Sequence, residues 1–362
     1  MSKKIVFAID TNSAGGGERV IATLANYFGA KGYETYLINS DSSSAFYPIS
    51  PSVTVVKMGL DRGKSGRIRR VLKKYYFLKR FLKEKKPDVL IPFLFNMEAP
   101  AILAGLRTKT NVVTSVRNAS KAYSKRERRF RRFFYPKIFG VVFQSKVVQQ
   151  YEDFSHLRNT TVIMNPMVNE ITEPMIPVPY CNRRNVVISV ARLEPQKNHE
   201  MTIRAFAMIC EEFPGLELHI FGEGSLRNHL EKLIEELNIK GRVFLEGAVA
   251  EATLKNRDAK LFVMASNFEG FPNALAEAMA YGIPSISTDF DTGVASDLIE
   301  EGQNGWLVKV GDTMGLADKM RLVLNLQEKT DEVAEDCAKV FFRLRSDVIC
   351  AQWENFLFPT GE

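Results

Sequence analysis

The sequence predicts an α/β protein made of two doubly wound domains. Three observations predict it: strand-like and helix-like segments alternate from the first residues, a proline-rich stretch interrupts them near the middle, and the same alternation then restarts. The length of 362 residues is typical of two domains rather than of one hydrophobic core. Because such sheets bind ligands beyond the carboxyl ends of their strands, we expect a site in a cleft between the domains.

The first half of the chain alternates between strand and helix patterns, which favours a parallel sheet. It begins with a short apolar segment that ends at Asp10, and we interpret this segment as a strand rather than a signal peptide. The expected strands are Lys4–Ile9, Glu34–Ile38, Asp88–Phe93, Asn111–Val116 and Ile138–Phe143. The expected helices are Glu18–Phe28 and 67–84.

Four prolines between residues 165 and 182 indicate a linker with a hinge near 166–182. After it, the expected strands are Asn185–Val190, Glu217–Phe221, Val243–Glu246, Leu261–Met264 and Ser285–Ser287. The expected helices are His199–Phe213, Leu226–Leu237 and Ala274–Ala280. We therefore predict domains at 1–170 and 171–345, with a C-terminal helix in 346–362 that packs back on the first domain.

The composition excludes two classes of protein. No apolar run of the sequence approaches the roughly 18 residues that a membrane-spanning helix needs. The four cysteines are scattered without a CxxC pair, which suggests a reducing compartment and no structural zinc.

The second half contains two turns that suit a phosphate group. Arg192 lies just past an expected strand and Lys197 precedes the next helix, so a planar fork and a point charge could meet a diphosphate there. Gly222 and Gly224 follow the next strand and would let a ligand approach the backbone closely. Taken alone, each pattern is more often an ordinary surface turn.

Two glutamates in the stretch ASNFEGFPNALAEAMAYGIPSIS, residues 265–287, point to a polyhydroxylated ligand. Glu269 precedes a turn, and Glu277 lies about one turn into the helix that follows. The exposed N–H groups of a helix N-terminus attract anions, and a carboxylate can accept hydrogen bonds from a vicinal diol. One acid could hold a ribose and the other a sugar hydroxyl, although Glu269 could also merely cap the helix.

The set Arg192, Lys197, Glu269 and Glu277, with EGFPNALAEAMAYGIP and NGWLV, resembles glycosyltransferase family 4 over nearly the whole chain. The resemblance implies two Rossmann-like domains facing across a cleft (GT-B) and a retaining mechanism. It implies that Arg192 and Lys197 neutralise the donor diphosphate, that Glu277 holds the ribose and that Glu269 contacts the transferred sugar. It also assigns donor contacts to Gly222, Glu223, Gly224, Phe271, Pro272, Asn273, Ala274 and Leu275.

Two features of the first half bear on the same resemblance. The loop DTNSAGGGERV lacks the spacing GxGxxG of dinucleotide binding, and the family places Gly15, Gly16 and Gly17 beside the donor phosphates. Many relatives carry a histidine after the strand Asn111–Val116, where this chain has Arg117. Retaining transferases of this fold are thought to need no such base, so Arg117 would contact the sugar, an acceptor phosphate or the departing diphosphate.

Residues 61–137 are strongly basic, with 23 lysine and arginine residues against 5 acidic ones, while the whole chain has a net charge of +7. The segment 66–84 combines a helical apolar stripe with many cations, which is typical of a helix on an anionic membrane surface but also of a stripe packed on the sheet with solvated cations. Nucleic acid is the rival partner, and the chain has no nucleic-acid motif. This block resembles transferases that extend undecaprenyl-diphosphate-linked glycans, such as campylobacter-type N-glycan GalNAc transferases. That likeness assigns the acceptor diphosphate to Arg67, Arg70, Lys73 and Lys74.

We therefore predict a retaining glycosyltransferase that moves a hexose or N-acetylhexosamine from a UDP-sugar to a lipid-diphosphate-linked glycan. We expect it to act peripherally on the cytoplasmic face of the cell membrane, with no metal, no other cofactor and no nucleic acid. Two alternatives stay open: a sugar-nucleotide epimerase of the same fold, and a non-catalytic protein that docks on membrane or nucleic acid. The epimerase would not need the basic segment 61–137, and the docking protein would not need Glu269.

Overall fold

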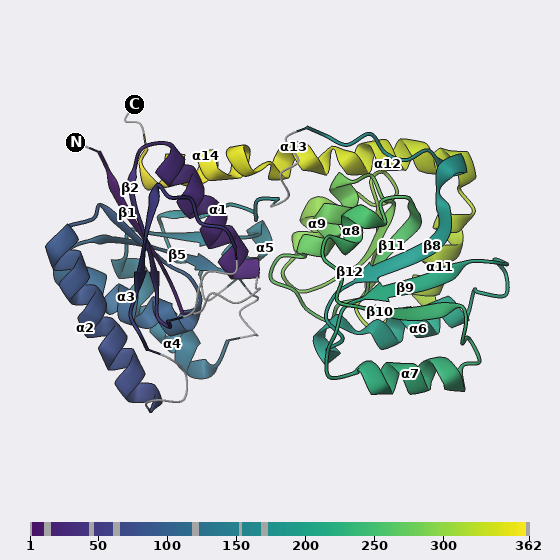
Figure 1. Ribbon diagram of the computed structural model, residues 1–362, viewed down its shortest axis with the longest axis horizontal. Coiled ribbons are helices and arrows are strands. Elements are labelled where there is room, and N and C mark those ends of the chain that lie inside the picture. Colours follow the sequence, from purple (N-terminus) through teal and green to yellow (C-terminus); the bar gives the residue numbers. More distant parts are fainter. Residues whose placement is uncertain are drawn as a thin grey trace. The chain divides into compact units, whose positions relative to one another are not determined.

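The computed structural model describes residues 2–10, 16–42, 47–60, 66–117, 123–151, 154–167 and 173–359, with the backbone alone for Arg67. Gly15, Asn118 and the predicted domain boundary after residue 170 lie outside these residues. The chain falls into two compact units, Met1–Val168 with Ser346–Glu362 and Asn169–Arg345. Figure 1 shows a parallel sheet flanked by helices in each unit.

Unit 1 contains a seven-stranded parallel sheet of order β3-β2-β1-β4-β5-β6-β7. Its strands are β1 (Lys4–Ile9), β2 (Glu34–Asn39), β3 (Val53–Lys57), β4 (Val89–Pro92), β5 (Asn111–Val116), β6 (Gly140–Phe143) and β7 (Thr160–Val162). Its helices are α1 (Gly16–Ala30), α2 (Arg67–Lys85), α3 (Phe95–Thr108), α4 (Lys125–Phe134), η2 (Tyr135–Lys137), α5 (Lys146–Gln149) and α14 (Ser346–Leu357).

The two faces of this sheet are covered by different helices. The strands are apolar almost throughout, as expected of a parallel sheet that is buried on both sides. Side chains of α1 and of the C-terminal helix α14 pack on one face, and those of α2 and α3 pack on the other. The strand order reverses between β1 and β4, so the carboxyl ends of these two strands form the switch point where such sheets bind ligands.

Unit 2 contains a six-stranded parallel sheet of order β10-β9-β8-β11-β12-β13. Its strands are β8 (Arg184–Val190), β9 (Glu217–Phe221), β10 (Val243–Gly247), β11 (Ala259–Met264), β12 (Ser285–Asp289) and β13 (Trp306–Lys309). Its helices are α6 (His199–Ala207), α7 (Arg227–Glu236), α8 (Ala252–Lys255), α9 (Asn273–Ala280), α10 (Val294–Leu298), α11 (Thr313–Leu324), α12 (Thr330–Ala338) and α13 (Val340–Leu344). Among the described residues of unit 2, the 3-10 turns η3 (Tyr180–Asn182), η4 (Pro195–Lys197) and η5 (Gln327–Lys329) complete the fold. The switch point of this sheet lies between β8 and β11.

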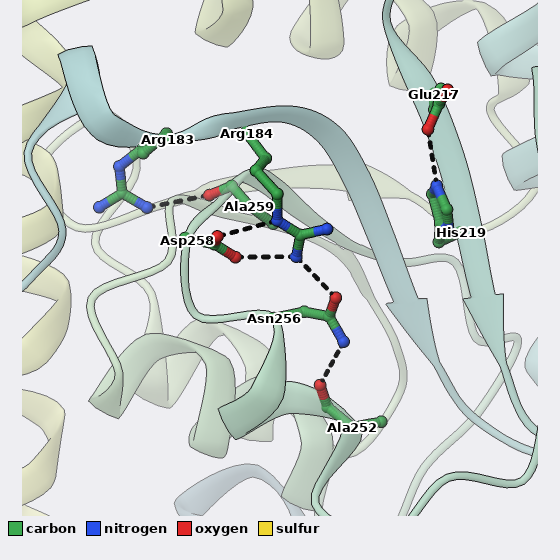
Figure 2. Close-up of polar contacts among 8 residues, drawn as sticks. All are labelled: Arg183, Arg184, Glu217, His219, Ala252, Asn256, Asp258 and Ala259. Atoms are coloured by element: carbon green, nitrogen blue, oxygen red, sulfur yellow. Dashed lines mark hydrogen bonds and ion pairs between the residues drawn. The ribbon is translucent and has the colours of Figure 1, made fainter.

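A polar clamp holds the two central strands of unit 2 together at the edge where they begin (Figure 2). Arg184 donates from Nε and Nη2 to the two carboxylate oxygens of Asp258, each at 2.8 Å. Its Nη2 also donates to Oδ1 of Asn256 at 2.8 Å, and Arg183 donates to the carbonyl of Ala259 at 2.9 Å. Bidentate pairs of this kind fix orientation as well as distance. The clamp therefore sets the register of β8 against β11, and so of the loops at their far ends.

The fold class predicted from the sequence is confirmed: both units are parallel α/β sheets covered by helices. The predicted helix His199–Phe213 ends earlier, at Ala207, because residues 208–213 continue as tight turns in which Ile209 and Cys210 both donate to the carbonyl of Phe206. In unit 1 the strands β3 and β7, the helices α3, α4 and α5 and the short turn η2 were not predicted.

Candidate active site

The loops that leave β8 and β11 are joined to each other at the switch point of unit 2. The backbone N–H of Asn267 donates to the carbonyl of Gln196 at 2.8 Å, and its side-chain amide donates to the carbonyl of Pro195 at 2.9 Å. Asn198 in turn donates to Oδ1 of Asn267 at 3.1 Å. These bonds bring residues about 70 positions apart in the chain to one edge of the sheet.

Lys197 and Glu269 meet at this junction. Nζ of Lys197 lies 2.5 Å from Oε1 of Glu269, and the same oxygen accepts a hydrogen bond from Oγ of Ser266 at 2.7 Å. The second carboxylate oxygen, Oε2, has a long contact of 3.4 Å with Nε2 of Gln196. Glu269 is 6% exposed, so its carboxylate is fixed in place with acceptor capacity left on Oε2.

Arg192 supplies a second cation in the same loop. Its side chain is exposed, and within the described residues its guanidinium makes no hydrogen bond or ion pair. The nearby Glu194 is held away by Ser225, whose N–H and Oγ both donate to its carboxylate, at 3.1 and 2.8 Å. These hydrogen bonds, with the charge of Arg192, lower the pKa of Glu194. The structure thus leaves five guanidinium N–H donors available at the end of β8.

Helix α9 begins next to Glu269 and has no side-chain cap at Pro272. Asn273 and Ala274 are half-buried, and Phe271, Pro272 and Leu275 are buried. Glu277 is half-buried on the same helix. All members of the predicted set 269–277 therefore belong to one loop and the start of one helix, where amide groups of the first turn carry a partial positive charge.

Gly222 and Gly224 serve the packing of two loops. A Cβ on Gly222 would lie 1.9 Å from the carbonyl oxygen of Ala191, and one on Gly224 would lie 2.4 Å from that of Leu193. The loops are joined by the N–H of Leu193, which donates to the carbonyl of Glu223 at 3.0 Å. Gly222 also has φ +153°, a conformation that a side chain would strain. The glycines hold the β9 loop against the backbone on either side of Arg192, and the side chain of Glu223 pairs with Arg227 at 2.9 Å.

His199 was not among the predicted site residues, yet its side chain contacts the loop that follows β8. It is 2% exposed at the start of α6, and its Nε2 lies 3.2 Å from the carbonyl oxygen of Ala191. Burial lowers the pKa of His199 to about 4. The ring is therefore neutral at physiological pH and acts as a donor to Ala191. Its position directly after the turn from β8 was the only sign of this role in the sequence.

Unit 1 has a charged cluster at the end of β1. Lys74 of α2 donates to Oδ1 of Asp10, which also accepts from Oγ of Ser40 at 2.6 Å, and Nη2 of Arg70 lies 3.7 Å away. Burial opposes ionisation of Asp10, but the hydrogen bonds and charges of these partners outweigh it and keep its pKa below the usual value. Lys74 also donates to the carbonyl of Asn96 at 3.2 Å.

The predicted basic residues on α2 thus differ in how deeply they are buried. Lys74 is 3% exposed, so it is a buried ion-pair partner rather than one of the solvated cations that surround the stripe. Lys73 is exposed, whereas Arg70 is half-buried. Among the described residues its Nε and Nη2 have no hydrogen-bond partner, and Nη2 lies at ion-pair distance from Asp10. Arg131 of α4 is also buried, where Glu98 accepts from its Nη2 at 2.9 Å.

Arg117, Gly16 and Gly17 lie at the carboxyl edge of the same sheet. Arg117 follows β5, and its Nη1 donates to Oγ of Ser115 at 3.3 Å. Gly16 is exposed at the first position of α1, and Gly17 is half-buried, with space for a Cβ 3.7 Å from Leu94. Leu94 has φ +65°, which is rare for a leucine and marks a strained backbone just after β4.

The described residues contain no group of three or more His, Cys, Asp or Glu side chains that could hold a metal ion. Among the same residues, no helix is both long and apolar enough to cross a membrane. The four cysteines are free thiols, and of these Cys181 alone is exposed.

Comparisons with known proteins match both halves of the chain to glycosyltransferases. The model of "Glycosyltransferase Family 4" matches residues 14–164, and that of "Glycosyl transferases group 1" matches residues 180–340. A Campylobacter jejuni enzyme, GalNAc-α-(1→4)-GalNAc-α-(1→3)-diNAcBac-PP-undecaprenol α-1,4-N-acetyl-D-galactosaminyltransferase, is 31% identical over 328 residues, which are 89% of each chain. The chain belongs to glycosyltransferase family 4. The chain is therefore a glycosyltransferase, rather than a sugar-nucleotide epimerase or a non-catalytic docking protein.

Solved structures of glycosyltransferases share the architecture of this family 4 enzyme. The structure of HepE from Anabaena in complex with UDP superposes with a TM-score of 0.77 at 19% identity, and covers 98% of this chain and 99% of HepE. The apo form of the lipopolysaccharide outer core galactosyltransferase WaaB has a TM-score of 0.79 at 21% identity, with 98% and 99% of the two chains covered. The glycosyltransferase therefore has the GT-B fold, as predicted from its motifs.

Proposed function

We propose that this glycosyltransferase is a retaining enzyme that moves a hexose or N-acetylhexosamine from a UDP-sugar to a lipid-diphosphate-linked glycan. The observation that carries the proposal is the Lys197–Glu269 pair beside the exposed Arg192, at the switch point of unit 2. The product would be part of a cell-surface polysaccharide or a glycoprotein glycan. The Campylobacter relative, which acts on an undecaprenol-linked glycan, supports the acceptor class, and HepE with its bound UDP supports the nucleotide.

The donor diphosphate would lie against Arg192, Lys197 and the first turn of α9. Arg192 has no competing partner within the described part of the chain, and α9 has no side-chain cap that would occupy its N–H groups. Charge that develops on the departing diphosphate would be stabilised by these preorganised groups. Glu277 would hold the ribose from the same helix.

Glu269 would orient the transferred sugar. Its Oε1 is held by Lys197 and Ser266, so the direction of Oε2 is set before any ligand arrives. Oε2 can accept a hydrogen bond from a sugar hydroxyl, since its one contact with Gln196 is long. Lys197 would link the two ends of the donor, because it touches Glu269 on one side and would touch the diphosphate on the other.

The proton of the acceptor hydroxyl would pass to the departing phosphate oxygen. His199 is unsuitable as a general base because its ring is buried and its Nε2 faces the carbonyl of Ala191. Oε1 of Glu269 is already held by Lys197 and Ser266, and the proposal assigns its other oxygen to the transferred sugar. This arrangement is consistent with a retaining transfer in which the leaving group acts as the base.

The acceptor diphosphate would be bound by α2. Arg70 is suited to this role because its Nε is buried without a hydrogen-bond partner among the described residues, and a buried donor without a partner favours an anion. Lys73 would add an exposed charge. Lys74 would act indirectly, by holding Asp10 and so the position of Arg70.

Contact with the inner face of the cell membrane would come from the outer side of α2. Ile68, Leu72 and Tyr76 recur every four residues on this side and are 78%, 49% and 63% exposed. Exposed cations border them: Arg69, Lys73, Arg80 and Lys83. An exposed apolar stripe with a cationic border is the pattern of a helix that lies on an anionic membrane.

The first test is a thermal-shift panel of UDP, GDP, ADP and their common sugars without added metal. A ligand at about 100 times its Kd stabilises the native state by about 2.7 kcal/mol, so UDP and one UDP-sugar should raise the melting temperature by several degrees. The same panel with Arg192→Ala should show a smaller shift. A shift with GDP or ADP alone would mean that the donor carries that nucleotide instead of UDP. No shift with any nucleotide would overturn the donor site.

A further inference from the structure

The guanidinium of Arg117 rests on the ring of Phe93, at the ends of the neighbouring strands β5 and β4. Its Cζ lies 5.0 Å from the centre of that ring. Phe93 in turn stacks on Trp353 of the C-terminal helix α14, with 6.4 Å between ring centres and an interplanar angle of 27°. Both aromatic side chains are fully buried. Three residues from distant parts of the sequence thus form a continuous contact from α14 to the carboxyl edge of the sheet.

Helix α14 is fixed firmly to unit 1. Glu354, next to Trp353, accepts hydrogen bonds from the phenol groups of Tyr27 and Tyr33, at 2.9 and 2.8 Å, and from Nζ of Lys31 at 2.7 Å. The other inward residues of the helix, among them Leu357, are buried in the core formed with α1 and the sheet. Trp353 therefore presents a rigid surface to Phe93.

The remaining contacts of Arg117 are neutral. Its Nη2 donates to Oδ1 of Asn165, and its Nη1 donates to Oγ of Ser115. Within the described residues no carboxylate forms an ion pair with it, although Glu18 and Tyr123 act on it at longer range. Burial lowers the pKa of Arg117 to about 10, so the group is still a cation at neutral pH. The cation–π contact with Phe93 and these two hydrogen bonds together set the direction of this charge.

We propose that Trp353 is a positioning residue for glycosyl transfer, which holds Phe93 and through it the guanidinium of Arg117. The inference rests on the proposed function, together with the sequence-based expectation that Arg117 contacts the sugar, an acceptor phosphate or the departing diphosphate. A cation–π contact contributes about 0.5–2 kcal/mol, and a charged group displaced by about 1 Å can lose up to a hundredfold in rate. Loss of the indole should therefore reduce kcat about tenfold and leave the KM for the UDP-sugar unchanged.

A double-mutant cycle tests this coupling with Trp353→Leu, Arg117→Met and the double variant. Turnover is followed as UDP release from UDP-N-acetylgalactosamine, with a polyprenyl-diphosphate-linked N-acetylgalactosamine as acceptor, and melting temperature is measured in parallel. Leu357→Ala is the matched control, because it removes a buried side chain of the same helix and the same core without a ring contact to Phe93. Trp353→Phe should restore most of kcat, since it keeps an aromatic ring for the stack.

We expect Trp353→Leu and Leu357→Ala to lower the melting temperature alike, and Trp353→Leu alone to lower kcat. In the Arg117→Met background, Trp353→Leu should still lower the melting temperature but should reduce kcat no further. An equal reduction of kcat in both backgrounds, or an equal loss in the Leu357→Ala variant, would overturn the inference while the proposed function stands. An unmodified protein without turnover on any UDP-sugar would overturn the proposed function, and the inference with it, before any variant is compared.

Discussion

Nζ of Lys197 lies 2.5 Å from Oε1 of Glu269, although the two residues are 72 positions apart in the chain. The pair exists because β11 returns to lie beside β8 after β9 and β10 have been added on its other side. The carboxyl ends of the two strands therefore meet, and their loops are closed by the bonds of Asn267. In the proposed site, one lysine is shared between the carboxylate assigned to the sugar and the groups assigned to the diphosphate.

Replacement of Glu269 by glutamine should separate transfer from nucleotide binding. Glutamine keeps the shape and can still accept from Ser266, but it removes the charge that would hold a sugar hydroxyl. A hydrogen bond to a charged group contributes about 1.5–3 kcal/mol, so kcat/KM should fall roughly 10- to 100-fold. Calorimetry should find UDP affinity within a factor of about three of the unmodified enzyme.

The matched control for that substitution is Glu200→Gln. Glu200 is also paired with a cation, at 2.8 Å from Arg204, but the pair lies on the surface of α6. Surface pairs of this kind contribute at most about 1 kcal/mol, and turnover should be unchanged. Full activity of the Glu269→Gln variant would remove Glu269 from the sugar site.

Most strands and the candidate residues of this site could be predicted from the sequence, but the way in which they are arranged in space could not. Val186–Val190 in β8 and Leu261–Met264 in β11 are short, mostly apolar runs, and such runs identify a buried strand wherever it lies in the sheet. Which strands are neighbours depends on the crossovers between them, which local patterns do not encode. The Lys197–Glu269 contact therefore required the structure.

Arg192→Ala should weaken UDP binding without lowering stability. The side chain is exposed and has no hydrogen-bond partner in the part of the chain that the structure describes, so its loss removes no contact of the folded state. A charge-assisted bond to phosphate is worth about 1.5–3 kcal/mol, and the Kd for UDP should rise roughly 10- to 100-fold. Isothermal titration calorimetry measures this directly.

Lys255→Ala is the control for lost charge, because Lys255 is exposed and lies before the amino end of β11, at the other edge of the sheet. It should bind UDP as the unmodified enzyme does. If both variants bind UDP with unchanged affinity, Arg192 does not contact the diphosphate.

Acidification should destabilise the enzyme through His199. The pKa of His199 is about 4 in the folded state, where burial opposes its charge, against an ordinary value of 6.5. Between these values the unfolded chain binds a proton that the folded chain does not, so stability is lost as the pH falls from about 6.5 to 4. The difference corresponds to about 3 kcal/mol over the whole window. Urea denaturation at several pH values would measure it.

His199→Gln should flatten that pH dependence, because glutamine cannot take up the proton and can still donate to the carbonyl of Ala191. His229→Gln is the comparison, since His229 is exposed and pairs with Glu200 at 3.1 Å. The His229→Gln variant should keep the acid sensitivity of the unmodified enzyme. An unaltered slope in His199→Gln would show that other groups are responsible.

The basic block is where residue patterns were least informative. Lys74 follows Val71 and precedes Leu78 on one side of α2, so its helical position matched the buried stripe, yet a lysine is usually solvated. Its partner Asp10 directly follows β1, 64 positions earlier, and no local sequence pattern indicates a buried pair between them. The strand β3 was missed for a related reason: at the sheet edge its residues are mostly exposed and give no continuous apolar run.

Lys74→Met should destabilise unit 1 by about 3–5 kcal/mol, because it leaves the buried carboxylate of Asp10 without its main partner. Asp10→Asn in the same chain should recover part of the loss, since the uncompensated charge is then absent. Lys73→Met is the control: Lys73 is the exposed neighbour, and its loss should change the free energy of unfolding by less than about 0.5 kcal/mol. Equal effects of the Lys74 and Lys73 substitutions in urea denaturation would contradict the buried pair.

Binding to anionic vesicles should depend on the outer side of α2. Each cation near an anionic surface contributes about 1 kcal/mol, so replacing Arg69, Lys73 and Arg80 by glutamine should weaken partition into phosphatidylglycerol-containing vesicles on the order of a hundredfold. Replacing Lys232, Lys255 and Lys309, which are exposed on unit 2, removes the same charge and should leave binding nearly unchanged. Sedimentation with vesicles of phosphatidylcholine alone separates the apolar contribution, which Leu72→Ser should reduce. If the two triple variants bind equally, charge as a whole rather than α2 would govern the association.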